Sequence, residues 1–172
     1  LSLRPGRETG YVSLVKSTIL IGHTLAVLFT AVAISSALLA EDGLYIAEFM
    51  ADNRGTVVDE DESAVDWIEL HNDSSAAVDL LGFRLTDDSL VPDKWIFPAR
   101  MLDPDARLLV FASGKDRRAV AGTLHTNFSL DADGEYLALA SPSGELLSVW
   151  EPYSAQEEDQ SYGLAAEQRL HS

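Results

Sequence analysis

The sequence predicts an all-β domain, a β-sandwich of about eight or nine short strands, preceded by an N-terminal secretory segment. Three observations support this fold. Short strand-like runs recur along the chain, turn residues separate them about every 8–12 residues, and no stretch after residue 40 has the spacing of an amphipathic helix. Short strands at regular intervals, without a strand–helix–strand rhythm, are typical of sandwiches and barrels.

Length and charge limit the classes of protein that the chain can belong to. Its 172 residues suffice for one domain. Of its 28 acidic residues, 27 lie from Glu41 onward, where only 9 of the 12 basic residues lie, giving that part a net charge of −18. Such a domain repels nucleic-acid phosphates and anionic lipid. The absence of cysteine excludes disulfides, thiolate metal sites and cysteine nucleophiles.

The N-terminal segment has the three parts of a secretory signal peptide. Lys16 precedes an apolar run over 19–39, and small residues end the run before the acidic Glu41. Cleavage is expected after Ala37 or Ala40. An uncleaved transmembrane anchor is the alternative, because 21 residues can just span a bilayer, and a buried helix of the domain is a third reading. The predicted organisation is a leader over 1–40, a sandwich over 44–152, and an acidic polar tail or linker over 153–172.

The stretch 66–72 is predicted to be an early central strand. Trp67, Glu69 and His71 share one face of this strand, and the aliphatic residues between them share the other. Turn residues follow at once from Asn72. Either Trp67 in this strand or Trp95 further along the chain is expected to supply the large aromatic anchor of the core between two sheets.

The other predicted strands follow from β-rich or alternating runs, and turns separate them. The run 44–50 comes first, an acidic loop over 51–63 follows it, and 107–112 is the most continuous apolar run and is expected to be central. The remaining strands are predicted at 78–80, 83–87, 94–97, 135–140 and 145–150.

The connections carry specific turn signals. Gly82 is expected in a positive-φ turn, Pro98 at a strand end, and Gly134 in a hairpin turn. Residues 141–144 close a second hairpin. The basic connection 113–124 could form one helical turn.

Five pieces of the sequence, in order, resemble the lamin tail domain family. The pieces are Trp67–Asn72, Val78–Leu85, Trp95–Pro98, Leu102–Gly114 and Phe128–Leu139, and Gln156–Gly163 is similar to the end of the module in secreted prokaryotic members. Asp105 stands where the family usually has glycine. The resemblance covers roughly 44–163 and implies an immunoglobulin-like β-sandwich.

The resemblance implies a non-catalytic module. Lamins carry this domain on a coiled coil and use it for chromatin and membrane partners, but this chain has no heptad rod and no basic nuclear-localisation cluster. We therefore expect the secreted accessory type, which is predicted to bind a protein or a cell-surface polymer, not nucleic acid, and to touch a membrane only through an uncleaved N-terminal segment. The alternative is an accessory domain at the N-terminus of a larger secreted enzyme or surface protein.

The acidic run is the one candidate metal site that we singled out. Asp59, Asp61 and Glu62 offer oxygen ligands of the kind that Ca²⁺ prefers. The run lacks the spacing of a calcium loop, so a solvated acidic loop is the favoured interpretation and no cofactor is expected. The segment Asp131–Glu135 has a similar composition, for which a turn is favoured.

Other reactive residue types lack catalytic patterns. His71, His125 and His171 are too scattered for a zinc site, and Ser113 has no nucleophile elbow around it. Glu48 and Glu69 would need a cleft to act as a glycosidase pair. The basic cluster in 115–118 is expected to be solvated or paired with carboxylates. No enzyme activity is predicted, and the residues expected to carry the structure are Trp67, Glu69, Asn72, Gly82, Trp95, Phe97, Pro98 and Gly134.

Overall fold

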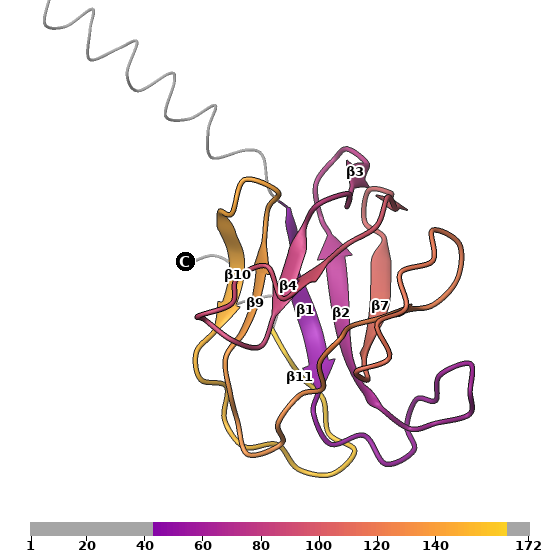
Figure 1. Ribbon diagram of the computed structural model, residues 1–172, viewed down its shortest axis with the longest axis vertical. Coiled ribbons are helices and arrows are strands. Elements are labelled where there is room, and N and C mark those ends of the chain that lie inside the picture. The colour runs from indigo at the N-terminus through magenta and orange to yellow at the C-terminus, as the bar shows by residue number, and fades with distance from the viewer. Residues whose placement is uncertain (1–42, 165–172) are drawn as a thin grey trace, which may run out of the picture. The chain divides into compact units, whose positions relative to one another are not determined.

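The computed structural model describes residues 43–164, which form two layers of β-sheet (Figure 1). Asp42–Ser172 is one compact unit. Its described part contains eleven strands, five of which are two residues long, and no helix. Within these residues no helix long and apolar enough to cross a membrane occurs. The predicted signal or transmembrane helix lies outside the described residues.

The larger sheet has five strands in the order β11-β1-β2-β7-β8. Its members are β1 (Leu44–Met50), β2 (Asp66–Asn72), β7 (Arg107–Ala112), β8 (Leu124–His125) and β11 (Tyr162–Gly163). The predicted strand at 66–72 is its central strand and pairs antiparallel with β1 and β7. The predicted run 107–112 is also internal, because β8 pairs with it in parallel.

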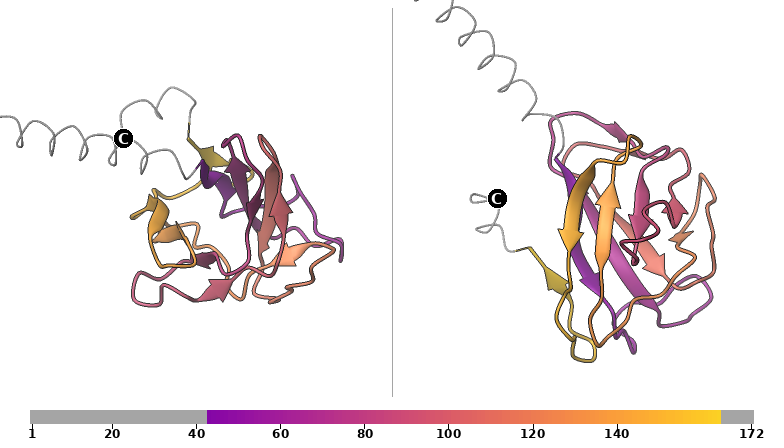
Figure 2. Two further views of the ribbon diagram at one scale, coloured as in Figure 1. Left: turned by 90° about the horizontal axis from the view of Figure 1, so that it is seen from above. Right: turned by 60° about the vertical axis from the view of Figure 1, so that its left-hand side comes forward.

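The second layer is a four-stranded sheet in the order β10-β9-β4-β5. It contains β4 (Arg84–Thr86), β5 (Trp95–Ile96), β9 (Leu137–Ala140) and β10 (Leu146–Trp150). A two-stranded ribbon, β3 (Val78–Asp79) with β6 (Met101–Leu102), lies outside both sheets in the pairing pattern. Figure 2 shows the two main sheets as separate layers. The structure is therefore the predicted sandwich.

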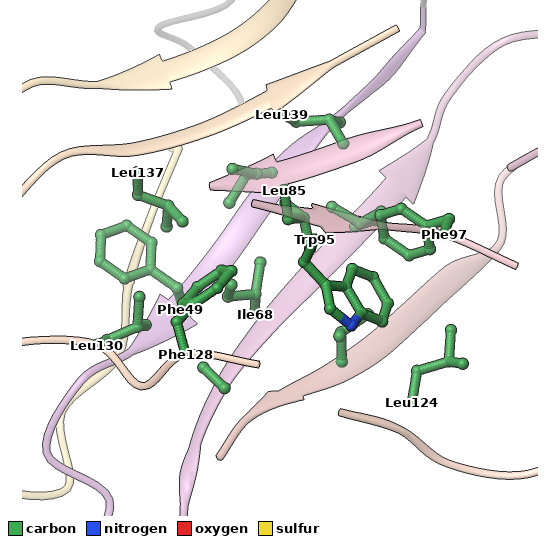
Figure 3. Packing of buried hydrophobic residues seen from close by; sticks show 14 of the residues in the cluster. Phe49, Ile68, Leu85, Trp95, Phe97, Leu124, Phe128, Leu130, Leu137 and Leu139 are labelled. Carbon is green, nitrogen blue, oxygen red and sulfur yellow. The ribbon is translucent and has the colours of Figure 1, made fainter. Parts of the chain in front are cut away.

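The core lies between the two sheets. Phe49 and Ile68 reach into it from the five-stranded sheet, and Leu85, Trp95 and Leu139 reach into it from the other (Figure 3). Trp95 is fully buried and lies edge to face on Phe97, with ring centroids 4.6 Å apart. Burial of about 25 cal/mol per Å² of apolar surface stabilises such a core. Trp95 is thus the large aromatic anchor that the sequence led us to expect at one of two tryptophans.

Trp67 packs on the opposite face of the five-stranded sheet. It belongs to a small cluster with Met50 and Phe111, and Val57 and Val65 of the segment between β1 and β2 pack against this cluster. The alternation of β2 explains this place, because Trp67 faces away from Ile68. Trp67 therefore anchors the loop to the sheet and is not part of the inter-sheet core.

The turn residues behave as predicted at three places and differently at one. Gly82 has a φ of 83°, which favours glycine. Residues 141–144 close the hairpin between β9 and β10, and Pro98 follows the edge strand β5. Gly134 has a φ of 102°, but its turn leads from an irregular segment and not from a hairpin partner. A β-carbon there would lie 2.3 Å from the Tyr153 carbonyl oxygen, so close packing also requires glycine.

The structure corrects the predicted end of the sandwich. Residues 153–164 were expected in a tail, but Tyr153 is buried in the core and β11 pairs with β1. The side chain of Gln156 accepts a hydrogen bond from the Ala51 amide at 2.7 Å. This segment therefore belongs to the domain. The connection 113–124 contains no helical turn, and the strands β6, β8 and β11 were not predicted.

Candidate functional site

The loop between β1 and β2, which carries the acidic run, has a defined internal structure. Asn53 holds it through its side chain, which donates to the carbonyl oxygens of Val57 at 2.6 Å and Val65 at 2.8 Å. The same side chain accepts a hydrogen bond from the Thr56 amide at 3.0 Å. One buried amide side chain thus closes both ends of the loop.

The acidic run folds as a tight turn around Asp59. The Asp59 carboxylate is buried and accepts hydrogen bonds from the backbone amides of Asp61 at 2.9 Å and Ser63 at 3.0 Å. The Glu62 amide donates to the Asp59 carbonyl at 3.0 Å, and Glu62 itself has a φ of 60°. Aspartate is suited to this place because its short side chain bonds nearby backbone amides.

The basic connection after β7 pairs with this acidic turn. Lys115 donates to the carboxylates of Asp59 and Asp61, the latter at 2.7 Å. Arg117 donates to Asp61 at 2.6 Å and also to Glu60. The two loops therefore form one structure, which we call the ion-pair clamp and define as residues 59–61 with Lys115 and Arg117.

The clamp lowers the pKa values of all three of its carboxyl groups. A hydrogen bond from its own backbone amide contributes most to holding the pKa of Glu60 at about 2. The hydrogen bond from Arg117 contributes most to holding that of Asp61 at about 2. Burial raises the pKa of Asp59, but hydrogen bonds from Lys115 and the backbone outweigh it, so the net change is downward.

A buried histidine extends the clamp to the sheet. His125 on β8 is fully buried and stacks on Phe111, with ring centroids 5.3 Å apart. Its Nδ1 lies 2.8 Å from the Ser113 hydroxyl, and its Nε2 lies 3.0 Å from a Glu60 carboxylate oxygen. Both ring nitrogens are therefore hydrogen-bonded to side chains.

This trio has the residue types of a hydrolase triad, but its surroundings do not favour that chemistry. A serine nucleophile needs nearby N–H groups that can bind an oxyanion. The Gly114 amide donates to the Phe128 carbonyl at 3.1 Å, and the Lys115 amide is directed to the Ser113 hydroxyl at 3.3 Å. The two amides that follow the serine are thus occupied, and the trio instead ties the acidic turn to β8.

The sequence did not indicate this trio. In the sequence neither Ser113 nor His125 stands in a catalytic pattern, and Glu60 lies 65 residues from His125. No spacing rule relates residues so far apart. The parallel pairing of β8 with β7 places His125 near Ser113, and the fold of the acidic turn brings Glu60 to them.

The structure gives the residues of the candidate calcium site other partners. Asp59 and Asp61 share the Lys115 ammonium group, which supplies the positive charge between them. Glu62 is exposed and lies outside the clamp. Within residues 43–164 no three His, Asp or Glu side chains gather in a way that could hold a metal ion.

The outer face of the five-stranded sheet holds two further polar groups. Glu48 and Glu69 are direct cross-strand neighbours, but Glu48 accepts a hydrogen bond from Ser161 and Glu69 pairs with Arg107. The two glutamates have separate partners on an open sheet face. This arrangement does not resemble the facing carboxylates of a glycosidase cleft.

His71 lies on the same face, apart from His125. Its Nδ1 is 2.7 Å from the Tyr45 hydroxyl, and its Nε2 is 3.0 Å from an Asp105 carboxylate oxygen. Asp105 has a φ of 59°, which explains why glycine is usual at this place in the family that the sequence resembles.

Asn72 connects the end of β2 to two other segments. It is fully buried, and its amide group donates to the carbonyl oxygens of Ala76 and Leu102, both at 2.9 Å. Its side-chain oxygen accepts a hydrogen bond from the Ser74 hydroxyl at 2.6 Å. The asparagine that ends the predicted strand therefore has a structural task, and no ligand is needed to explain it.

A sandwich of two sheets around a continuous apolar core is the architecture of immunoglobulin-like domains. The Lamin Tail Domain family profile matches residues 39–154, and the chain belongs to this family. A comparison with curated proteins gives no significant match. Domains of this family are non-enzymatic, immunoglobulin-like interaction modules.

Proposed function

We propose that the chain is exported and acts outside the cytoplasm as a secreted prokaryotic-type lamin tail domain. Its role is to tether the protein that carries it to another protein or to a cell-surface polymer. Family membership supports a binding role. The charged, apolar and small-residue order of the first 40 residues supports export. The strongly acidic charge makes nucleic acid an unsuitable partner.

The observation that carries the non-catalytic part is the commitment of the charged side chains to one another. Lys115 and Arg117 are engaged by the acidic turn, and Arg107 is engaged by Glu69. These ion pairs hold the charged side chains in fixed positions on the surface, which supports a role in contact with a partner and not in catalysis.

Export is tested by fusing residues 1–40 to alkaline phosphatase without its own signal, because this enzyme needs disulfides that form only outside the cytoplasm. We expect phosphatase activity from the fusion. The double variant Leu28→Arg with Val32→Arg interrupts the apolar run and is expected to abolish the activity. Equal activity of both fusions, or none from either, contradicts export.

Tethering is tested by co-sedimentation of purified residues 42–172, the compact unit that holds the core, with isolated envelopes of the source cells. We expect saturable binding. Loss of binding after protease treatment of the envelopes identifies a protein partner, and its persistence identifies a polymer. No saturable binding to envelopes contradicts the tethering role.

A further inference from the structure

Three of the four edges of the two main sheets are very short. The edge strands β5, β8 and β11 each contain two residues, whereas β10 contains five. Short edge strands are one way in which proteins prevent pairing with other chains. Figures 1 and 2 show β10 at the outer border of the four-stranded sheet, with β9 as its single neighbour in the sheet.

The backbone of β10 is available on its open side. Its ladder hydrogen bonds are with β9, and no other backbone hydrogen bond involves Leu146–Trp150 among the described residues. One register shift lies between Leu146 and Ser148, after which Ser148–Trp150 pair with β9 without interruption. A regular strand with free N–H and C=O groups is a template for an added strand.

Apart from this register shift, β10 lacks the residue types that usually protect an edge. The strand contains no lysine, arginine or proline. Leu146 and Val149 are 55% and 43% exposed. Leu147 and Trp150 pack against the core but are only half-buried, so the core-facing side of β10 is only partly covered. A further strand beside β10 would remove apolar surface from water on both faces.

The charge at the two ends of β10 selects the partner. Glu145 and Glu151 flank the strand and are both exposed. An antiparallel pairing of β10 with a second copy would place Glu145 of one chain near Glu151 of the other, and like charges at a strand pair are destabilising. The same carboxylates attract lysine or arginine at the ends of a different chain.

We propose that β10 is the docking edge through which the domain holds a partner protein, by accepting an extended segment of it as a fifth strand of the four-stranded sheet. The inference rests on the proposed tethering function. The accepted segment has aliphatic residues at alternate positions, which lie beside Leu146 and Val149. It has lysine or arginine at its ends, which lie beside Glu145 and Glu151.

The test uses the nonapeptide Lys-Arg-Val-Thr-Ile-Thr-Val-Arg-Lys and a matched peptide with glutamate at its four charged positions. Each is titrated into ¹⁵N-labelled residues 42–172, and amide shifts and hydrogen exchange are recorded by NMR. We expect the basic peptide to shift the amides of 146–150 and to slow their exchange. The acidic peptide is expected to do neither.

Two variants separate docking on the strand from general attraction to an acidic protein. Val149→Lys and Val120→Lys make the same substitution at exposed valines, one on β10 and one in a loop. We expect Val149→Lys to weaken the basic peptide at least tenfold and Val120→Lys to change its affinity less than twofold. Equal weakening by the two variants, or shifts centred outside β10, overturns the proposal.

Two further results also overturn the docking edge. One is a dimer of the unit that Val149→Lys dissociates, because the edge would then be a self-association surface. The other is binding of the Val149→Lys unit to envelopes at the wild-type level, which leaves the tethering function standing. Failure of the wild-type unit to bind envelopes concerns the tethering function itself, so the two failures are distinguishable.

Discussion

The ammonium nitrogen of Lys115 lies 2.7 Å from a carboxylate oxygen of Asp61 and also bonds the buried carboxylate of Asp59. One lysine thus bridges two aspartates of the acidic turn. The pairing joins a loop that precedes β2 to a loop that follows β7. It fixes the acidic turn and the basic connection against each other, which gives the acidic turn a defined shape.

The first prediction concerns the stability that Asp59 contributes. Asp59→Ala removes two backbone hydrogen bonds and the ion pair at a buried position, and we expect a loss of about 2 kcal/mol in the free energy of unfolding. Asp93→Ala, at an exposed aspartate, should change it by less than about 0.5 kcal/mol. Urea denaturation of both variants measures the difference, and equal effects would show that the clamp is not formed in solution.

Calcium gives the second prediction. Because Lys115 already supplies the positive charge between Asp59 and Asp61, we expect calcium to leave the melting temperature of residues 42–172 unchanged relative to chelator. The check is a thermal melt with calorimetric titration. Saturable heat and a raised melting temperature that are both lost on Asp59→Ala with Asp61→Ala would instead establish a calcium site.

The third prediction is a stability maximum on the acid side of neutrality. Burial raises the pKa of Asp66 from 3.8 to about 6. A carboxyl with a raised folded-state pKa adds stability that is full below about 4 and is lost as the pH rises through 6. The clamp carboxyls have lowered pKa values, so their contribution is lost as the pH falls from about 4 toward 2. Stability should therefore be greatest near pH 4–5.

Asp66→Asn tests whether Asp66 causes the loss of stability that we expect as the pH rises toward neutrality. The amide can still accept the hydrogen bond from Leu130, but it does not titrate. Because Asp66 is only half-buried, we expect a gain of about 1 kcal/mol at pH 7 and none at pH 4. Urea denaturation at both pH values measures this, and an equal change at the two would refute the assignment.

Most of the fold can be predicted from the pattern of strand-like runs in the sequence. The predicted runs 44–50 and 107–112 coincide with β1 and β7, because alternation and apolar continuity reflect burial directly. The two-residue strands β6, β8 and β11 are too short to leave a periodic signal. They pair because larger neighbours position them, which is a tertiary effect.

The polar contacts were less predictable than the strands. The pairing of the basic connection with carboxylates was one of two expected outcomes, but the sequence did not say which carboxylates. The partners are set by contacts between loops that lie far apart in the sequence, such as that of His125 on β8 with Glu60 of the acidic turn. The sequence likewise does not show that Trp67 and Trp95 pack in different clusters, since both are large aromatic residues in strands.

The fourth prediction separates those two tryptophans. Trp95→Ala empties a site at the centre of the inter-sheet core, and we expect a loss of about 3–5 kcal/mol. Trp67→Ala should cost less, about 2–3 kcal/mol, because the loop residues Val57 and Val65 that cover it can move into the space. Equilibrium denaturation measures both losses. A larger loss for Trp67 than for Trp95 would contradict this assignment of the core.

The last prediction concerns the backbone at Asp105. Its φ of 59° suits glycine and is tolerated by aspartate, whose short side chain also reaches His71. Alanine has neither advantage, so Asp105→Ala should be less stable than Asp105→Gly by about 1 kcal/mol. In a helix or strand the glycine variant is usually the less stable of the two, so the order expected here is the reverse. Thermal and urea unfolding of the two variants measure it, and an Asp105→Ala chain as stable as Asp105→Gly would show that the turn relaxes to a negative φ.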